Sequence, residues 1–170
     1  VIYTPPTIKQ PLIQYPGYNG GSDWGGIAVD TKQRIIVNNY NDMPNYNRLV
    51  SRAETDERLA SEKAGSHASL APQKGAPYGT DFNAGWRMPF MQLVCKEPLY
   101  GGIRAINLDT GEQLWDGALG TARRNGPFSI PSMMPLNIGT PDNGGAVIIA
   151  SGLVFIAAAT DNLIREIDIN

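Results

Sequence analysis

Four residues near the start of the chain have side chains suited to hold a flat, polar ligand. Asp23 and Trp24 stand directly before an apolar run, and Asn38 and Asn39 close the next one. Asparagine amides both donate and accept hydrogen bonds, and tryptophan offers an apolar ring for stacking or edge contacts. These four residues are therefore candidates for a cofactor-binding site. A structural alternative stays open, in which Trp24 packs between sheets and the asparagines cap turns.

Three other carboxylates deserve the same comparison. Asp30 and Asp109 lie in turn sequences, where an aspartate commonly accepts hydrogen bonds from its own backbone. Asp161 follows an apolar run beside a row of small alanines, which leaves room for a ligand. A turn role and a ligand role both remain open for Asp161.

Several chemistries lack the residues that they need. His67 is the single histidine and Cys95 the single cysteine, so no histidine triad, histidine metal site or internal disulfide has a framework. The glycine cluster at 19–26 is not followed by the Gly-Lys-Ser/Thr of a phosphate loop. A net charge of -2 gives no electrostatic footprint for nucleic acid. We therefore predict no catalytic and no metal-ligating residue within this chain.

The elements that carry these residues read as strands. Residues 146–150 and 153–157 are apolar and β-branched, and the Ser151-Gly152 pair between them suits a tight turn, so we predict a hairpin. Their nearly continuous hydrophobicity indicates that both faces of the sheet are covered. The same pattern occurs 119 residues earlier, where Gly25-Gly26 corresponds to Gly144-Gly145 without a gap. The unit is repeated.

Further strands complete the pattern. Residues 102–108 and 112–115 supply a third and a fourth strand to the first copy, and 163–169 supply a third strand to the second. Tandem four-stranded antiparallel units are typical of a β-propeller. We therefore predict an all-β fold, a partial β-propeller with one blade at 16–120 and an incomplete next blade at 140–170. Because such repeats need neighbours to bury their faces, we expect residues 1–170 to be a fragment of one propeller domain.

A long insertion at about 41–100 interrupts the first blade. Its charged middle, 52–74, predicts either two or three turns of surface helix or disorder. The flanking stretches 40–46 and 77–98 are rich in proline, asparagine, glycine and aromatic residues. We expect them to form ordered, irregular loops over one face of the propeller, where function often lies.

Residues 105–115 read Ala-Ile-Asn-Leu-Asp-Thr-Gly-Glu-Gln-Leu-Trp. This segment resembles the tryptophan-docking repeat of the pyrroloquinoline quinone (PQQ) dehydrogenase family. More specific matches point to its membrane-bound glucose, quinate and shikimate branch. They are the segments 23–30, 75–79, 95–98, 120–128 and 155–162, which occur in the family's order.

This resemblance implies a fold and a function. The fold would be an eight-bladed propeller that holds PQQ and a divalent cation, calcium or magnesium, near its axis. The enzyme would oxidise a sugar or cyclic polyol on the periplasmic side of the bacterial inner membrane and pass electrons to ubiquinone. It would be attached by an N-terminal anchor that is absent here.

The resemblance also assigns site residues. The family position that matches Asn39 lies beside PQQ, and Asp23 would be near the same site. The family's general base and its cofactor lysine precede Val1, so we expect the fragment alone to be inactive.

One alternative function stays open on the repeat alone: a cofactor-free propeller that serves as a scaffold for protein–protein interaction.

No signal peptide opens the chain. The longest apolar stretch, 146–159, is interrupted at 151–152 and is shorter than the roughly 20 residues of a membrane-spanning helix.

Overall fold

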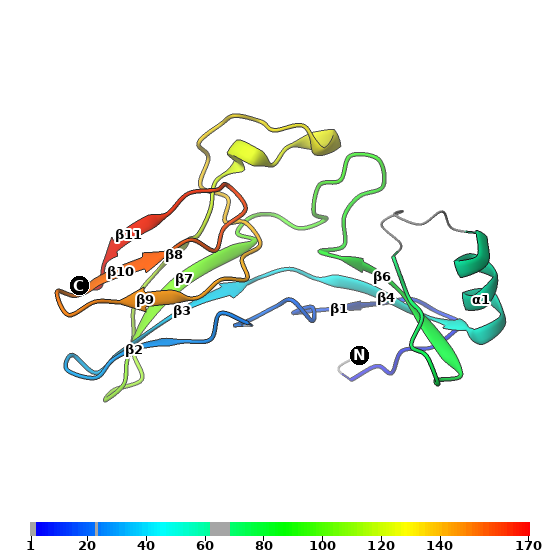
Figure 1. Cartoon of the computed structure of the whole chain (residues 1–170), viewed down its shortest axis with the longest axis horizontal. Coiled ribbons are helices and arrows are strands. Elements are labelled where there is room, and N and C mark those ends of the chain that lie inside the picture. Colours follow the sequence, from blue (N-terminus) through cyan, green and yellow to red (C-terminus); the bar gives the residue numbers. More distant parts are fainter. Residues whose placement is uncertain (1–2, 23, 62–68) are drawn as a thin grey trace.

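The computed structural model describes residues 3–22, 24–61 and 69–170. These residues form three antiparallel sheets and one α-helix. Two of the sheets pack together at one end of the molecule, and the third lies with the helix at the other end (Figure 1). Among the described residues, no helix has both the length and the apolar character needed to cross a bilayer.

The first sheet is the predicted propeller blade. It has the order β2-β3-β7-β8, made of β2 (Ala28–Asp30), β3 (Ile35–Asn41), β7 (Gly101–Asn107) and β8 (Gln113–Ala118). The turn between β2 and β3 is closed by the Asp30 carboxylate, which accepts the backbone N–H groups of Lys32 and Gln33. All four predicted strands are confirmed, and the fold class is that of a partial β-propeller.

The second sheet is the incomplete blade. It has the order β11-β10-β9, made of β9 (Ala146–Ile148), β10 (Leu153–Ile156) and β11 (Arg165–Asp168). Gly152 has a φ of 83° in the β9–β10 turn. That backbone conformation is accessible to glycine at little cost, so the predicted hairpin and its turn are confirmed.

The insertion contains a third sheet, which differs from our expectation of irregular loops. Its order is β1-β4-β6-β5, made of β1 (Leu12–Gln14), β4 (Asn45–Ser51), β5 (Leu70–Ala71) and β6 (Tyr78–Ala84). Strand β1 comes from before the first blade and pairs with β4, with Leu12 opposite Asn47. The stretches at 40–46 and 77–98 are thus partly strand, because they find partners that composition alone does not reveal.

The predicted surface helix is confirmed at one end of the charged segment, as α1 (Arg52–Ser61). The Arg52 guanidinium donates to the carbonyl oxygens of Pro72, Ala76 and Tyr78 at 2.8–3.0 Å. Gly79 lets β6 approach the helix, since a Cβ there would lie 2.6 Å from Thr55 Oγ1. Residues 62–68 lie outside the described residues.

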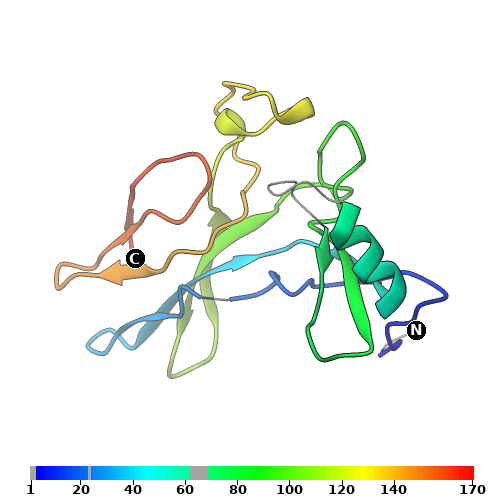
Figure 2. The ribbon, with the colours of Figure 1, turned by 45° about the vertical axis from the view of Figure 1, so that its right-hand side comes forward.

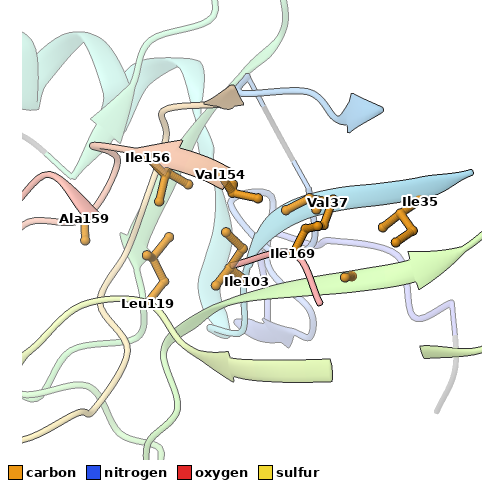
Figure 3. Close-up of a cluster of buried hydrophobic side chains, with 9 residues drawn as sticks. Ile35, Val37, Ile103, Leu119, Val154, Ile156, Ala159 and Ile169 are labelled. Carbon is orange, nitrogen blue, oxygen red and sulfur yellow. The ribbon is translucent and has the colours of Figure 1, made fainter. Parts of the chain in front are cut away.

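One hydrophobic core joins the two blades (Figure 3). From the first blade and the segment after it come Ile35, Val37, Ile103, Ala105 and Leu119, and from the second come Val154, Ile156, Ala159 and Ile169. Val37 and Val154 are both 0% exposed. Because the cluster draws on both sheets, each blade buries its apolar face against the other.

The repeated glycine pairs form a close contact between the two blades. A Cβ on Gly25 would lie 2.2 Å from Gly144 O, and a Cβ on Gly145 would lie 2.4 Å from Gly25 O. Such distances admit no side chain, so backbone packs directly on backbone at this point. The 119-residue repeat therefore corresponds to a physical contact between its two copies.

Trp115 adds a polar link between the blades, because its Nε1–H donates to Ile169 O at 2.9 Å. Replacing Trp115 by phenylalanine removes the donor together with the five-membered ring of the indole, which packs against the core. We expect the free energy of unfolding to fall by at least about 1 kcal/mol, the usual net worth of one hydrogen bond. Chemical denaturation of the Trp115→Phe protein measures this, and an unchanged midpoint would show that the link contributes nothing.

Candidate functional site

The side chains of β3 divide between the two faces of the first blade. Successive residues of a strand point to opposite faces, and the burial of β3 alternates accordingly. Asn39 and Asn41 lie on the face that carries Val37 into the core, and they are 5% and 3% exposed. The apolar interface between the blades thus ends in two buried amides.

Asn38 points to the other face. Its Nδ2 donates to Ser22 Oγ in the segment that leads into β2. The bridge between Gly21 and Asn41 shows that this segment lies beside the end of β3. Asn38 and Asn39 thus lie within β3, opposite Arg104 and Ile103 of β7, and not at the end of a strand as the sequence predicted. Strand β3 extends past β2 at this point, and we call this edge of the blade the rim. The side chains of Asn38 and Asn39 point to opposite faces of the sheet and do not come together there.

The remaining two predicted site residues are Trp24 and Asp23. Trp24 is 85% exposed and lies neither in the core nor between the described blades. Asp23 lies outside the described residues. Of the predicted cofactor-binding residues Asn39, Asp23, Trp24 and Asn38, three are described, and among these three only Asn39 is buried.

Asp142, which the sequence analysis overlooked, is the partner of both buried amides. Asn39 Nδ2 donates to Asp142 Oδ1. Asn41 Nδ2 donates to Asp142 O at 2.8 Å, and Asp142 N donates to Asn41 Oδ1 at 2.9 Å. A signal for Asp142 was present, since it occupies in the second copy of the repeat the position of Asp23 in the first, 119 residues earlier.

Two oxygens in this network have no hydrogen-bond partner among the described residues: Asn39 Oδ1 and Asp142 Oδ2. Burial raises the pKa of the Asp142 carboxyl to about 7, although the hydrogen bond from Asn39 acts in the opposite direction. Buried polar atoms are nearly always satisfied in native proteins. These two oxygens are therefore available for hydrogen bonds with a group that lies outside the described residues.

The Asp161 carboxylate is a second buried polar group, and both of its oxygens accept hydrogen bonds. Its carboxylate accepts the backbone N–H of Thr121 at 2.8 Å, the Thr121 hydroxyl at 2.9 Å and the Arg165 guanidinium. Burial raises the pKa of Asp161, but the bonds from Arg165 and Thr121 outweigh it and hold the pKa at about 2. Asp161 is therefore a charged link between the 119–122 segment and the start of β11.

A cavity of about 340 Å³ adjoins this end of the blades. It lies between the loop at 87–100 and the loop at 122–141, which both stand above the sheets (Figure 2). Arg87 and Arg124 line it together with Tyr100, and Thr140 and Pro141 bring its wall to the residue before Asp142. Its volume is at the lower end of the range usual for small-molecule sites.

Comparison with known proteins identifies the family. The model of the PQQ-type glucose/ethanol/alcohol dehydrogenase β-propeller domain matches residues 1–170. The chain belongs to this family. The PQQ-dehydrogenase resemblance found in the sequence is thereby confirmed, and the cofactor-free scaffold is not favoured.

Three relatives illustrate the range of the family. The glycerol dehydrogenase large subunit of Gluconobacter oxydans is 43% identical over 98% of this chain, which covers 23% of that protein. The quinoprotein glucose dehydrogenase of Escherichia coli is 33% identical over 96% of this chain, which covers 21% of that protein. The probable quinate dehydrogenase (quinone) of Xanthomonas campestris pv. juglandis is 33% identical over 98% of this chain, again 21% of that protein. The chain thus spans less than a quarter of these relatives.

Proposed function

We propose that this chain is part of a PQQ-dependent dehydrogenase that oxidises a sugar or a polyol. The observation that carries the proposal is the buried Asn39 amide, whose Oδ1 has no partner among the described residues at the rim shared by two blades of a PQQ-type propeller. PQQ is a flat quinone with polar groups around its edge, and a free amide atom at a buried rim fits such an edge.

In the proposed enzyme, the cofactor and the protein have different roles in the reaction. Bound PQQ supplies the two-electron redox chemistry, and the protein binds and orients it. In this chain Asn39 would contribute a polar contact to the cofactor, while the glycine contacts and the shared core keep the rim rigid. Asp23, Trp24 and Asn38 are proposed to line the outer part of the same site.

The substrate is proposed from the relatives and from the cavity. Relatives are named for glycerol, glucose and quinate, all of which carry several hydroxyl groups. The 340 Å³ cavity has arginine, asparagine and serine side chains in its wall and is large enough for one such molecule. We propose that it forms part of the path by which a polyol reaches the rim.

The acceptor, the cation and the compartment are further parts of the proposal. Ubiquinone as electron acceptor is supported by the word "quinone" in the name of the Xanthomonas relative. A calcium or magnesium ion and a location on the periplasmic side of the inner membrane, with an N-terminal anchor, rest on the family resemblance. Within the described ranges, no group of three or more histidine, cysteine or carboxylate side chains could hold a metal.

The full-length protein, reconstituted with PQQ and calcium, tests the activity. We expect reduction of a dye or a ubiquinone analogue with at least one of glycerol, glucose, quinate and shikimate. PQQ binding with no reduction for any of them would refute the substrate class. Failure to bind PQQ at all would refute the proposal as a whole.

Replacing Asn39 by alanine tests the site. We expect the dissociation constant for PQQ to rise about tenfold, since one buried hydrogen bond to a polar ligand contributes roughly 1.5 kcal/mol or somewhat less. Titration of the full-length apoprotein with PQQ, followed by the cofactor's absorbance, measures the change. Asn47→Ala in β4, which removes only an exposed bond to Gln14, is the matched control. An unchanged affinity for the Asn39 variant would remove Asn39 from the site.

A further inference from the structure

Asp142 ties the second blade to the buried amides of the first. It is 3% exposed, and three hydrogen bonds join it to β3, one from Asn39 and two exchanged with Asn41. The two bonds with Asn41 use the backbone N–H and C=O of Asp142, so they fix the position of its main chain. Only the side chain of Asp142 contacts Asn39.

This contact determines which way the Asn39 amide faces. A carboxamide has an acceptor on one side and a donor on the other. Asp142 Oδ1 accepts the bond from Asn39 Nδ2, and it remains an acceptor when the carboxyl carries its proton on Oδ2. As long as the carboxyl is charged, or carries its proton on Oδ2, the amide directs Nδ2 toward Asp142, as it does in the structure, and Oδ1 is left as its open polar atom.

The backbone around Asp142 is held tightly in place. Gly101 in β7 lies so close that a Cβ on it would be 2.2 Å from Thr140 O and 2.7 Å from Asp142 Oδ2. An antiparallel bridge also pairs Asp142 with Ala159 of the second blade. The carboxyl is thus set against Asn39 by contacts from both blades before any ligand arrives.

We propose that Asp142 is a positioning residue for the cofactor site, which holds the Asn39 amide in the one orientation that presents Oδ1 to PQQ. This inference rests on the proposed function. Its physical benefit is preorganisation, because an amide already fixed in its bound orientation loses no rotational freedom when the ligand binds. In this role Asp142 acts through Asn39, since its unpartnered Oδ2 lies against Gly101, where a Cβ would come within 2.7 Å of it.

A double-mutant cycle in the full-length apoprotein tests this role. The variants are Asp142→Ala, Asn39→Ala and the two combined, each titrated with PQQ and each unfolded in denaturant. Asp142→Asn is the conservative variant, because it keeps an acceptor oxygen of the same shape. Asp81→Asn is the control, since the partners of the Asp81 side chain within the described ranges are Arg48, Arg58 and Ser69, in and beside the third sheet.

We expect Asp142→Ala to weaken PQQ binding about fivefold to tenfold, as expected for the loss of roughly one hydrogen bond. The combined variant should bind no more weakly than Asn39→Ala alone, because Asp142 acts through Asn39. Asp142→Asn should stay within about threefold of the original protein, and Asp81→Asn should bind normally. If Asp142→Ala does not fold, Asp142→Leu takes its place, since it has similar volume and no acceptor.

Other outcomes would contradict the positioning role of Asp142. Effects on PQQ affinity that add in the combined variant would overturn the positioning role and leave Asp142 as a clasp between the blades. Loss of stability in Asp142→Ala without a change in PQQ affinity would do the same. If Asn39→Ala alone leaves PQQ affinity unchanged, or the original protein binds no PQQ, then the proposed site or function fails first and this inference fails with it.

Discussion

Gly101→Ala should destabilise the protein by about 1–3 kcal/mol or more, the usual range for a side chain forced into a filled space. The added Cβ would lie 2.2 Å from Thr140 O and 2.7 Å from Asp142 Oδ2. The first of these atoms belongs to the backbone and cannot swing away, so the 139–142 segment has to shift. Because Asp142 moves with this segment, PQQ binding should weaken as well.

Denaturant unfolding and PQQ titration of the full-length variant measure the two effects of Gly101→Ala. Gly117→Ala is the matched control. Gly117 is also a strand glycine of the first blade, but nothing lies within 4 Å of a Cβ built on it. We expect that substitution to change stability by no more than about 0.5 kcal/mol. Equal effects at the two glycines would show that close packing is not the cause.

Asp161→Ala should cost about 3–5 kcal/mol, the range for removing one partner of a buried ion pair. The Asp161 side chain is 0% exposed and that of Arg165 is 20% exposed. Without the carboxylate, the guanidinium and the Thr121 N–H lose their acceptor in a place where little water replaces it. Asp109→Ala is the control, since Asp109 pairs with Arg34 at 2.7 Å but both side chains are more than half exposed. That exposed pair should contribute less than about 1 kcal/mol.

The effect of Asp161→Ala should also depend on pH. The folded-state pKa of Asp161, about 2, is below its ordinary value of 3.8. A carboxyl whose pKa is lowered by folding stabilises the protein above the unfolded pKa and loses that contribution as pH falls toward the folded pKa. The stability difference between the original protein and the variant should therefore be full above about pH 5 and shrink by roughly 2 kcal/mol as pH falls to 2. A difference independent of pH would contradict the assignment.

The strands of the two blades were predictable because their signal is local. β-Branched runs, a Ser-Gly turn at 151–152 and the 119-residue repeat all stand in the sequence, and the structure has strands in each of those places. The third sheet was not predictable in the same way. Strand β4 owes its edge partner β1 to a contact that spans more than 30 residues, with Leu12 opposite Asn47. No periodicity of apolar residues marks either strand.

The candidate site was likewise predictable only in part. Asn38 and Asn39 were expected at a strand end because the apolar run stops there, but β3 continues to Asn41 through pairing with β7, and the alternation of side chains along it separates them onto two faces. Asp142 is distant from Asn39 in sequence and was identified only when the two blades were placed side by side. The repeat offset would have pointed to it, because it connects position 23 with position 142.

The core shared by the two blades bears on how the protein loses its structure. Val37 and Val154 come from different sheets, and both are fully enclosed by the same cluster. Melting either sheet would expose the apolar face of the other, so neither should persist as a folded intermediate. Amide hydrogen exchange in β3 and in β10 should consequently report one common opening event, whereas the third sheet, outside this cluster, is free to open separately.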